Sequence, residues 1–172
     1  EGVKSDVVVP NRYTYLDMGE KDQDNPLPWD EIQAASYTLW DSSIDYELMI
    51  ERSRDRMQKS PQMKLIDENA KWIKKVQSKD LYSLSYKDYS SELEQNETES
   101  KRFDAISDYE SNLSFESLPY ELLIMEKDSV FKKNRERWHE TMKKDVYMEE
   151  ALNVLSDLTM NSLDNGLSAL KD

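Results

Sequence analysis

The residue types that carry most enzyme chemistry are scarce in this chain. Its 172 residues include three glycines, one histidine and no cysteine. A phosphate-binding loop needs several glycines so that backbone N–H groups can approach the phosphate, and disulfides or thiolate chemistry need cysteine. The composition therefore excludes a nucleotide-binding loop, disulfides and thiolate chemistry, and it predicts no cofactor.

The single histidine does not have the surroundings of a catalytic zinc site. His139 lies in the run Trp-His-Glu-Thr-Met-Lys, and Lys143 stands where the zinc-protease pattern requires a second histidine. A histidine on a helix surface is therefore favoured over a metal ligand or a general base. The acidic turn at residues 22–25 has a partial likeness to a calcium loop, but Pro26 and Leu27 stand where a ligand and a turn glycine belong. We predict no metal site.

One serine and one lysine have a spacing that could support nucleophilic catalysis. Ser129 and Lys132 are one helical turn apart. Such a pair also needs donors for the oxyanion, and nothing nearby supplies a strained turn or glycine amides. Because both residue types are common here, a chance spacing is favoured, and the sequence predicts no catalytic residue.

Composition and charge indicate a mainly helical fold with solvated faces. Apolar residues make up 37% of the chain and charged residues 34%, with a net charge of −13. This charge repels phosphate backbones, so nucleic acid is not an expected partner. The longest apolar runs, residues 7–9 and 122–125, are too short for a membrane span.

Helical periodicity and capping residues predict five helices, with a short strand before them. The first two are an antiparallel hairpin, one capped at Asp41-Ser42 and ending near Lys59 and the next capped by Ser60. We expect a third helix from Ser85 to about Phe103, followed by a loop over residues 104–120 that contains a short strand at 113–118. A basic helix over residues 125–144 and a helix capped by Asp145 come next. The chain is expected to end in a frayed tail from Thr159, with Gly166 as the point where the helix stops.

The charges of two predicted helices are complementary. Acidic residues dominate the third helix, and the helix over residues 125–144 carries seven basic residues with Phe131 and Trp138. Such a basic face could bind nucleic acid. Pairing of the two helices within the chain is favoured as the explanation of both charge patterns.

The beginning of the chain predicts an extended segment. Three valines at residues 7–9 precede Pro10, which has no N–H to donate to a strand ladder, so a short strand is expected to end there. Residues 11–40 are rich in Pro, Asp, Asn, Tyr and Trp, which indicates an ordered connector. The start has neither an initiator Met nor a signal-peptide pattern, which predicts that the chain begins inside a longer protein.

A series of short motifs along the chain has the order of a known family. The most specific is Leu-Pro-Trp-Asp at residues 27–30. The others are Ser-Asp-Val-Val-Val-Pro at 5–10, Gly-Glu at 19–20, Tyr-Thr at 37–38, the segment 52–61, Tyr-Ser-Leu at 82–84 and the helix 145–158. With these motifs the chain resembles, over most of its length, the region that follows the catalytic core in bacterial tail-specific proteases, the carboxyl-terminal processing peptidases.

The resemblance implies a division of the chain and a place in a larger enzyme. Residues 1–10 would be the end of the protease core, 11–40 an extended connector and 41–172 the C-terminal helical domain. A serine/lysine dyad and a PDZ domain would lie upstream. Connector and packing roles fall on Pro10, Gly19, Leu27, Pro28, Trp29 and Asp30.

Two functional hypotheses follow. In the first, which the resemblance favours, the chain is a non-catalytic scaffold of a periplasmic serine endopeptidase, where it shapes the access of substrates. Its expected partners are the protease core of its own chain and protein substrates with unstructured C-termini, with an adaptor protein as a further candidate. In the second, the chain is a free-standing helical interaction or adaptor module whose grooves bind peptides.

Overall fold

The chain folds into helices, as a computed structural model shows for residues 5–28, 32–33, 35–38 and 44–169, with side chains described up to residue 160. No strand is present in these ranges, and the fold is mainly α, as predicted. The elements are the 3-10 helices η1 (Glu20–Asp22) and η2 (Asp104–Ile106) and the helices α1 (Tyr46–Lys59), α2 (Pro61–Gln77), α3 (Tyr86–Lys101), α4 (Pro119–Met125), α5 (Ser129–Lys143) and α6 (Val146–Ala169).

Side-chain caps fix where the helices begin. The Ser60 hydroxyl accepts from the Met63 N–H, and Ser85 caps α3 in the same way, both as predicted. Helix α1 is capped by Asp45, whose carboxylate accepts from the Leu48 N–H at 3.0 Å. The predicted cap pair at residues 41–42 lies outside the described residues. A carboxylate or hydroxyl at this position satisfies an N–H that the first helical turn leaves without a partner.

The two predicted strands are absent from the described part of the chain. Residues 7–9 form no ladder with another strand, and neither do residues 113–118. A β-strand needs a neighbouring backbone to accept and donate its ladder hydrogen bonds. Both predictions were wrong because sequence pattern alone does not supply that neighbour.

The predicted basic helix over residues 125–144 is present but begins later, at Ser129, and the predicted frayed tail is helical. Pro119 begins the short helix α4 inside the expected loop, and Asp128 then caps α5 by accepting from the N–H groups of Val130 and Phe131. Helix α6 continues through Gly166 to Ala169. A glycine inside a helix costs only about 1 kcal/mol, so without a following proline it did not stop the helix.

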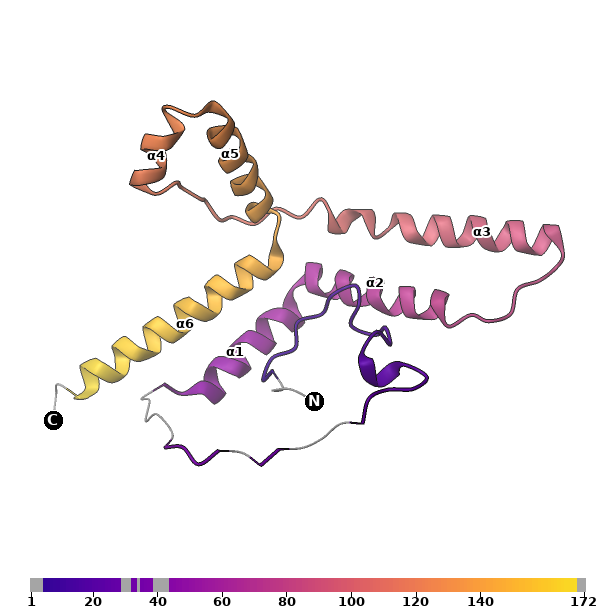
Figure 1. The fold of residues 1–172 in the computed structure, drawn as a ribbon, viewed down its shortest axis with the longest axis horizontal. Coiled ribbons are helices and arrows are strands. Elements are labelled where there is room, and N and C mark those ends of the chain that lie inside the picture. Colours follow the sequence, from indigo (N-terminus) through magenta and orange to yellow (C-terminus); the bar gives the residue numbers. More distant parts are fainter. Residues whose placement is uncertain (1–4, 29–31, 34, 39–43, 170–172) are drawn as a thin grey trace.

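The helices pair differently from the predicted order (Figure 1). Helices α1 and α2 meet at Ser60 and continue at an open angle, because a single intervening residue is too short for an antiparallel helical hairpin. The close antiparallel pair is α1 with α6, about a hundred residues apart in the sequence. Helix α3 runs back beside α2, and α4 with α5 forms a separate two-helix unit.

The core of the fold is small and lies where α2 meets the beginning of α6. Met63, Ile66 and Val146 are buried together. Partly buried side chains that pack on them are Val9, Met57, Ile106 and Tyr109. Ala70 is fully buried one turn beyond Ile66. The Trp72 ring of the same helix lies 5.6 Å from the Phe103 ring. Most of the remaining helical surface faces solvent.

A polar network joins α1 to α6 where the two helices run side by side. Arg56 donates to both oxygens of the Glu150 carboxylate at 2.8–3.2 Å and to Asp157 at 2.5 Å. The buried Ser53 hydroxyl donates to Glu150 at 2.7 Å, and Arg52 donates to Asp157 at 3.1 Å. The carboxylates of α6 are thus neutralised by α1, which allows Glu150 to be buried.

The network makes stability depend on pH. Burial alone would raise the pKa of the Asp157 carboxyl, but the hydrogen bonds and charges of Arg56 and Arg52 hold it below its ordinary value. A carboxyl whose pKa is lower in the folded state stabilises the fold above its unfolded pKa, and that contribution is lost as the pH falls through the folded value. The unfolded value is about 3.9.

We therefore expect the free energy of unfolding to be level between about pH 7 and 5 and to fall below about pH 4. Urea titrations at each pH measure it. In Asp157→Asn the fall should be shallower, whereas Asp24→Asn, in the exposed connector, should leave the profile of the parent chain. A D157N profile with the parent slope would contradict this assignment.

Candidate functional site: the seat of the entering chain

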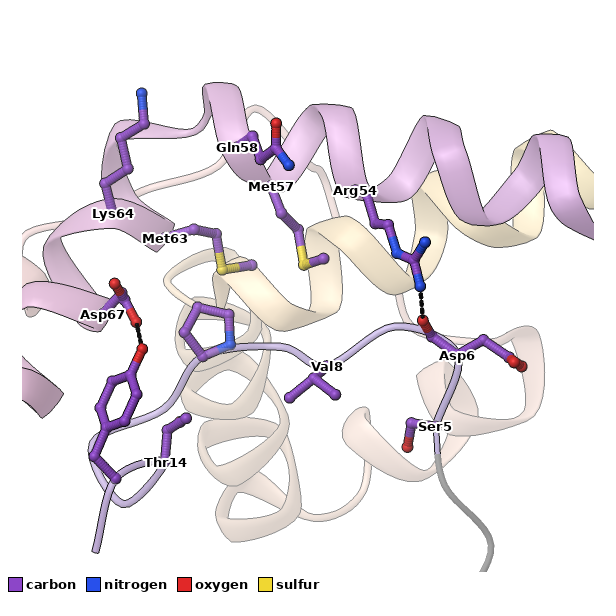
Figure 2. Close-up of a pocket in the computed structure, with 12 residues that line it drawn as sticks. Ser5, Asp6, Val8, Thr14, Arg54, Met57, Gln58, Met63, Lys64 and Asp67 are labelled. Carbon is purple, nitrogen blue, oxygen red and sulfur yellow. Dashed lines mark hydrogen bonds between the residues drawn. The ribbon is translucent and has the colours of Figure 1, made fainter.

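The N-terminal segment lies across α1, α2 and α6 and is held by hydrogen bonds to two of them. Arg54 of α1 donates to the Asp6 carbonyl at 2.7 Å (Figure 2). The Tyr147 hydroxyl of α6 donates to the Pro10 carbonyl at 2.8 Å. Between these points Val9 packs against the buried core. The extended segment therefore uses its backbone to bind helices rather than a sheet.

The next residues are fastened to α2. A turn follows Asn11, whose side-chain oxygen accepts from the Tyr13 N–H. The Tyr15 hydroxyl then donates to Asp67 at 2.6 Å, and Asp17 forms an ion pair with Lys74. The hydrogen bond to Asp67 raises the pKa of the Tyr15 hydroxyl. Residues 5–17, which we call the entering segment, are thus fixed along α1, α2 and α6. We call the surface of these three helices on which the segment lies the seat.

A cavity of about 640 Å³ lies between this segment and the junction of α1 with α2 (Figure 2). Its lining is mixed. Met57 and Met63 give an apolar floor, while Arg54 and Asp67 are each engaged by the segment itself. Because Arg54 and Asp67 already have partners in the segment, the cavity is suited to packing and to hydrogen bonding of a chain.

A second, more apolar groove of about 680 Å³ lies between α1 and α6 and is bordered by Val7 and Val9. Its walls include Met49 and Ile50 of α1 and Val154 of α6. The valines of the entering segment therefore sit at the mouth of an interhelical groove. Both cavities meet at the same extended segment, which makes residues 5–17 the candidate functional site.

The predicted connector and packing residues fall into four groups. Pro10 is partly buried in the seat. Gly19 caps η1, where its N–H donates to Asp22 at 2.9 Å and a Cβ would lie 3.1 Å from that carboxylate. The Leu27 N–H donates to Glu20, but its side chain and that of Pro28 are exposed. Trp29 and Asp30 lie outside the described residues.

His139, Ser129 and Lys132, the residues considered for catalysis, all lie on α5. His139 is partly buried, with its ring 6.4 Å from Phe115 and 5.9 Å from Trp138. Ser129 begins α5 and is exposed, and the Lys132 amine lies 3.9 Å from Glu136. Among the described residues no group of three or more His, Asp or Glu could hold a metal ion. None of the described helices combines the length and apolar character needed to cross a bilayer.

The side chains that form the seat were not predicted from the sequence. Arg54 and Tyr147 are an arginine in a charged helix and a tyrosine after a helix cap, and neither has a local signature. Their roles depend on backbone carbonyls far away in the sequence. In the sequence, only Pro10 indicated the position of the site, because a proline after three valines predicts where an extended segment ends.

Comparison with known proteins gives one family match. A family model described as the C-terminal domain of tail specific protease (DUF3340) matches residues 13–160. The matched region begins within the fastened segment and ends within α6. No solved structure matches the chain.

Proposed function

Because the chain belongs to the family of C-terminal domains of tail-specific proteases, we propose that it is the non-catalytic C-terminal part of a periplasmic serine endopeptidase that cleaves proteins from their C-termini. Residues 1–10 would end the protease core, 11–40 would connect, and 41–172 would form the helical domain. The domain would act as a scaffold that shapes the route of substrates with unstructured C-termini toward the core.

The observation that carries this proposal is the seat of the entering chain. Three helices hold residues 5–17 through Arg54, Tyr147 and Asp67. A helical domain joined to a protease core by a flexible linker would not need to bind the segment that connects the two. Fixing that segment transmits a defined orientation from the core to the helices, which a scaffold requires.

Exposed apolar side chains in the connector support the proposal that it packs against another part of the same protein. Leu27, Ile32 and Tyr37 have exposed side chains although all three are large and apolar. Surfaces of this kind are commonly interaction sites. We assign them to packing against the protease core, together with the Leu-Pro-Trp-Asp signature at residues 27–30.

The seat can be tested in the full-length protease with a matched pair of variants. Val9 packs on the core, whereas Val130, near the start of α5 and outside the site, is 67% exposed. We expect Val9→Asp to lower cleavage of a protein substrate with an unstructured C-terminus by about tenfold, because an unpaired carboxylate cannot remain in the apolar seat. The matched control, Val130→Asp, should cleave at the parent rate.

Cleavage of a short peptide substrate distinguishes an effect on substrate access from an effect on the catalytic step. Peptide cleavage by Val9→Asp should remain within about twofold of the parent protease, since the proposed dyad lies outside this chain. Equal cleavage of the protein substrate by Val9→Asp and the parent enzyme would contradict the scaffold role. Peptidase activity of residues 1–172 alone would contradict the non-catalytic assignment, and so would full processing by an enzyme that lacks residues 41–172.

A further inference from the structure

The apolar groove between α1 and α6 has a buried base and exposed walls. Met49, which lines it, is 4% exposed, whereas Tyr46 of α1 and Leu155 of α6 line the same groove and are 56% and 58% exposed. We call this cavity of about 680 Å³ the α1/α6 groove. Large apolar side chains left exposed beside a cavity are typical of an interaction site.

The polar side chains at the base of the α1/α6 groove have partners inside the chain. Ser53 donates to Glu150 at 2.7 Å, and Arg56 also donates to Glu150. The Tyr147 hydroxyl donates to the Pro10 carbonyl at 2.8 Å. A charged ligand would find no free counter-charge among these groups, so the groove is suited to apolar side chains.

The entering segment forms one border of the α1/α6 groove. Ser5, Asp6, Val7 and Val9 all line it, and Arg54 of α1 holds the Asp6 carbonyl at 2.7 Å. The chain before Ser5 therefore starts from the edge of the groove. Because four residues span at most about 14 Å, any body that precedes residue 1 is attached within that distance of Ser5.

A body attached so close has an advantage over a free molecule. A short linker holds it at an effective concentration of about 1 mM, which is about 100-fold above that of a free protein at about 10 µM. The net charge of −13 also opposes the approach of a second copy of the chain. Both effects favour an occupant that belongs to the same polypeptide.

We propose that the α1/α6 groove is the docking surface of the protease core, whose apolar side chains pack between Tyr46 and Leu155. This inference rests on the proposed function, in which residues 1–10 would end that core. The contacts of Val9 with the buried cluster and of Arg54 with Asp6 are then the edge of a larger interface. The protease core thus meets α1 and α6, the two helices that the polar network joins.

Photo-cross-linking in the full-length protease identifies what covers the groove. A benzophenone amino acid in place of Leu155 reacts on irradiation with groups that touch it. We expect it to join, within one chain, to a peptide from upstream of residue 1, which mass spectrometry of the digested product identifies. The same replacement of Tyr46, which is already aromatic, gives a second position if the first variant does not fold.

The neighbouring residue Ser156 supplies the matched control. It is exposed and does not line the groove, and consecutive helical residues point about 100° apart. Because benzophenone reacts only with groups in contact, we expect the upstream cross-link from position 156 to be at least about tenfold weaker than that from position 155. Circular dichroism confirms that each variant is helical.

The cross-linking is repeated with about 10 µM of a protein substrate that has an unstructured C-terminus, at which the attached core should still be favoured. Cross-links from positions 155 and 46 to this substrate would make the groove a substrate site and overturn the proposal. Cross-links to a second copy, seen as a doubled mass in a denaturing gel, would also overturn it. So would the absence of an upstream cross-link at both positions.

This experiment and the test of the proposed function fail separately. If neither position cross-links upstream but Val9→Asp loses cleavage of the protein substrate, the scaffold role stands and the docking surface does not. If position 155 cross-links upstream but Val9→Asp cleaves the protein substrate at the parent rate, the docking surface stands and the scaffold role does not.

Discussion

Replacing Ile66 with alanine is expected to lower the free energy of unfolding by about 3 kcal/mol, because large-to-small changes at buried aliphatic positions cost about 2–5 kcal/mol. Ile66 lies in the buried cluster with Met63 and Val146. That cluster also receives Val9, so the cavity would open beneath the entering segment. Few other buried side chains surround it to collapse inward, which favours a loss near the middle of the range.

The matched control is Leu84→Ala, at a fully exposed position of the loop before α3. Its free energy of unfolding should stay within about 0.5 kcal/mol of the parent value. Urea unfolding monitored by tryptophan fluorescence measures both variants. A loss below about 1 kcal/mol for Ile66→Ala would mean that the core of this fold lies elsewhere.

Replacing Arg56 with alanine is expected to cost about 2 kcal/mol. Removing one partner of a fully buried ion pair costs about 3–5 kcal/mol, and the Arg56 side chain is 29% exposed, so solvent reduces the penalty. The change leaves the buried Glu150 carboxylate with only the Ser53 hydroxyl as a partner and removes the link from α1 to Asp157.

Two further variants distinguish the buried network from an ordinary surface ion pair. Lys59→Ala removes the exposed pair with Asp55 on the same helix and should cost at most about 0.5 kcal/mol. In Arg56→Ala, a second change of Glu150 to Gln should recover part of the loss, because it removes the unpaired charge. If Arg56→Ala and Lys59→Ala cost the same, the network does not hold α1 to α6.

The buried cluster around Ile66 and the polar network around Arg56 together hold the helices of a domain whose core is small. The hydrophobic cluster joins α2, the beginning of α6 and the entering segment, while the polar network joins α1 to the middle of α6. The elements that hold the entering segment are thus joined by the cluster and the network, whereas α3, α4 and α5 belong to neither.

The sequence by itself determined the chemistry and the local structure. Three glycines, one histidine and no cysteine excluded several kinds of active site, and the short motifs, above all the one at residues 27–30, were enough to indicate the family. Ser60 and Ser85 predicted helix starts correctly, because a cap acts on N–H groups two or three residues away. Such short-range signals need no knowledge of the rest of the chain.

Only the tertiary structure decided which elements meet. Helix α1 pairs with α6 and not with α2, the valines at residues 7–9 bind helices and not a sheet, and α3 stays apart from α5. Arg56 and Tyr147 acquire their roles from partners more than ninety residues away. Charge and periodicity indicate which side of a helix will be buried. Which element covers that side depends on the lengths of the connecting segments and on the angles between helices, which no local pattern encodes.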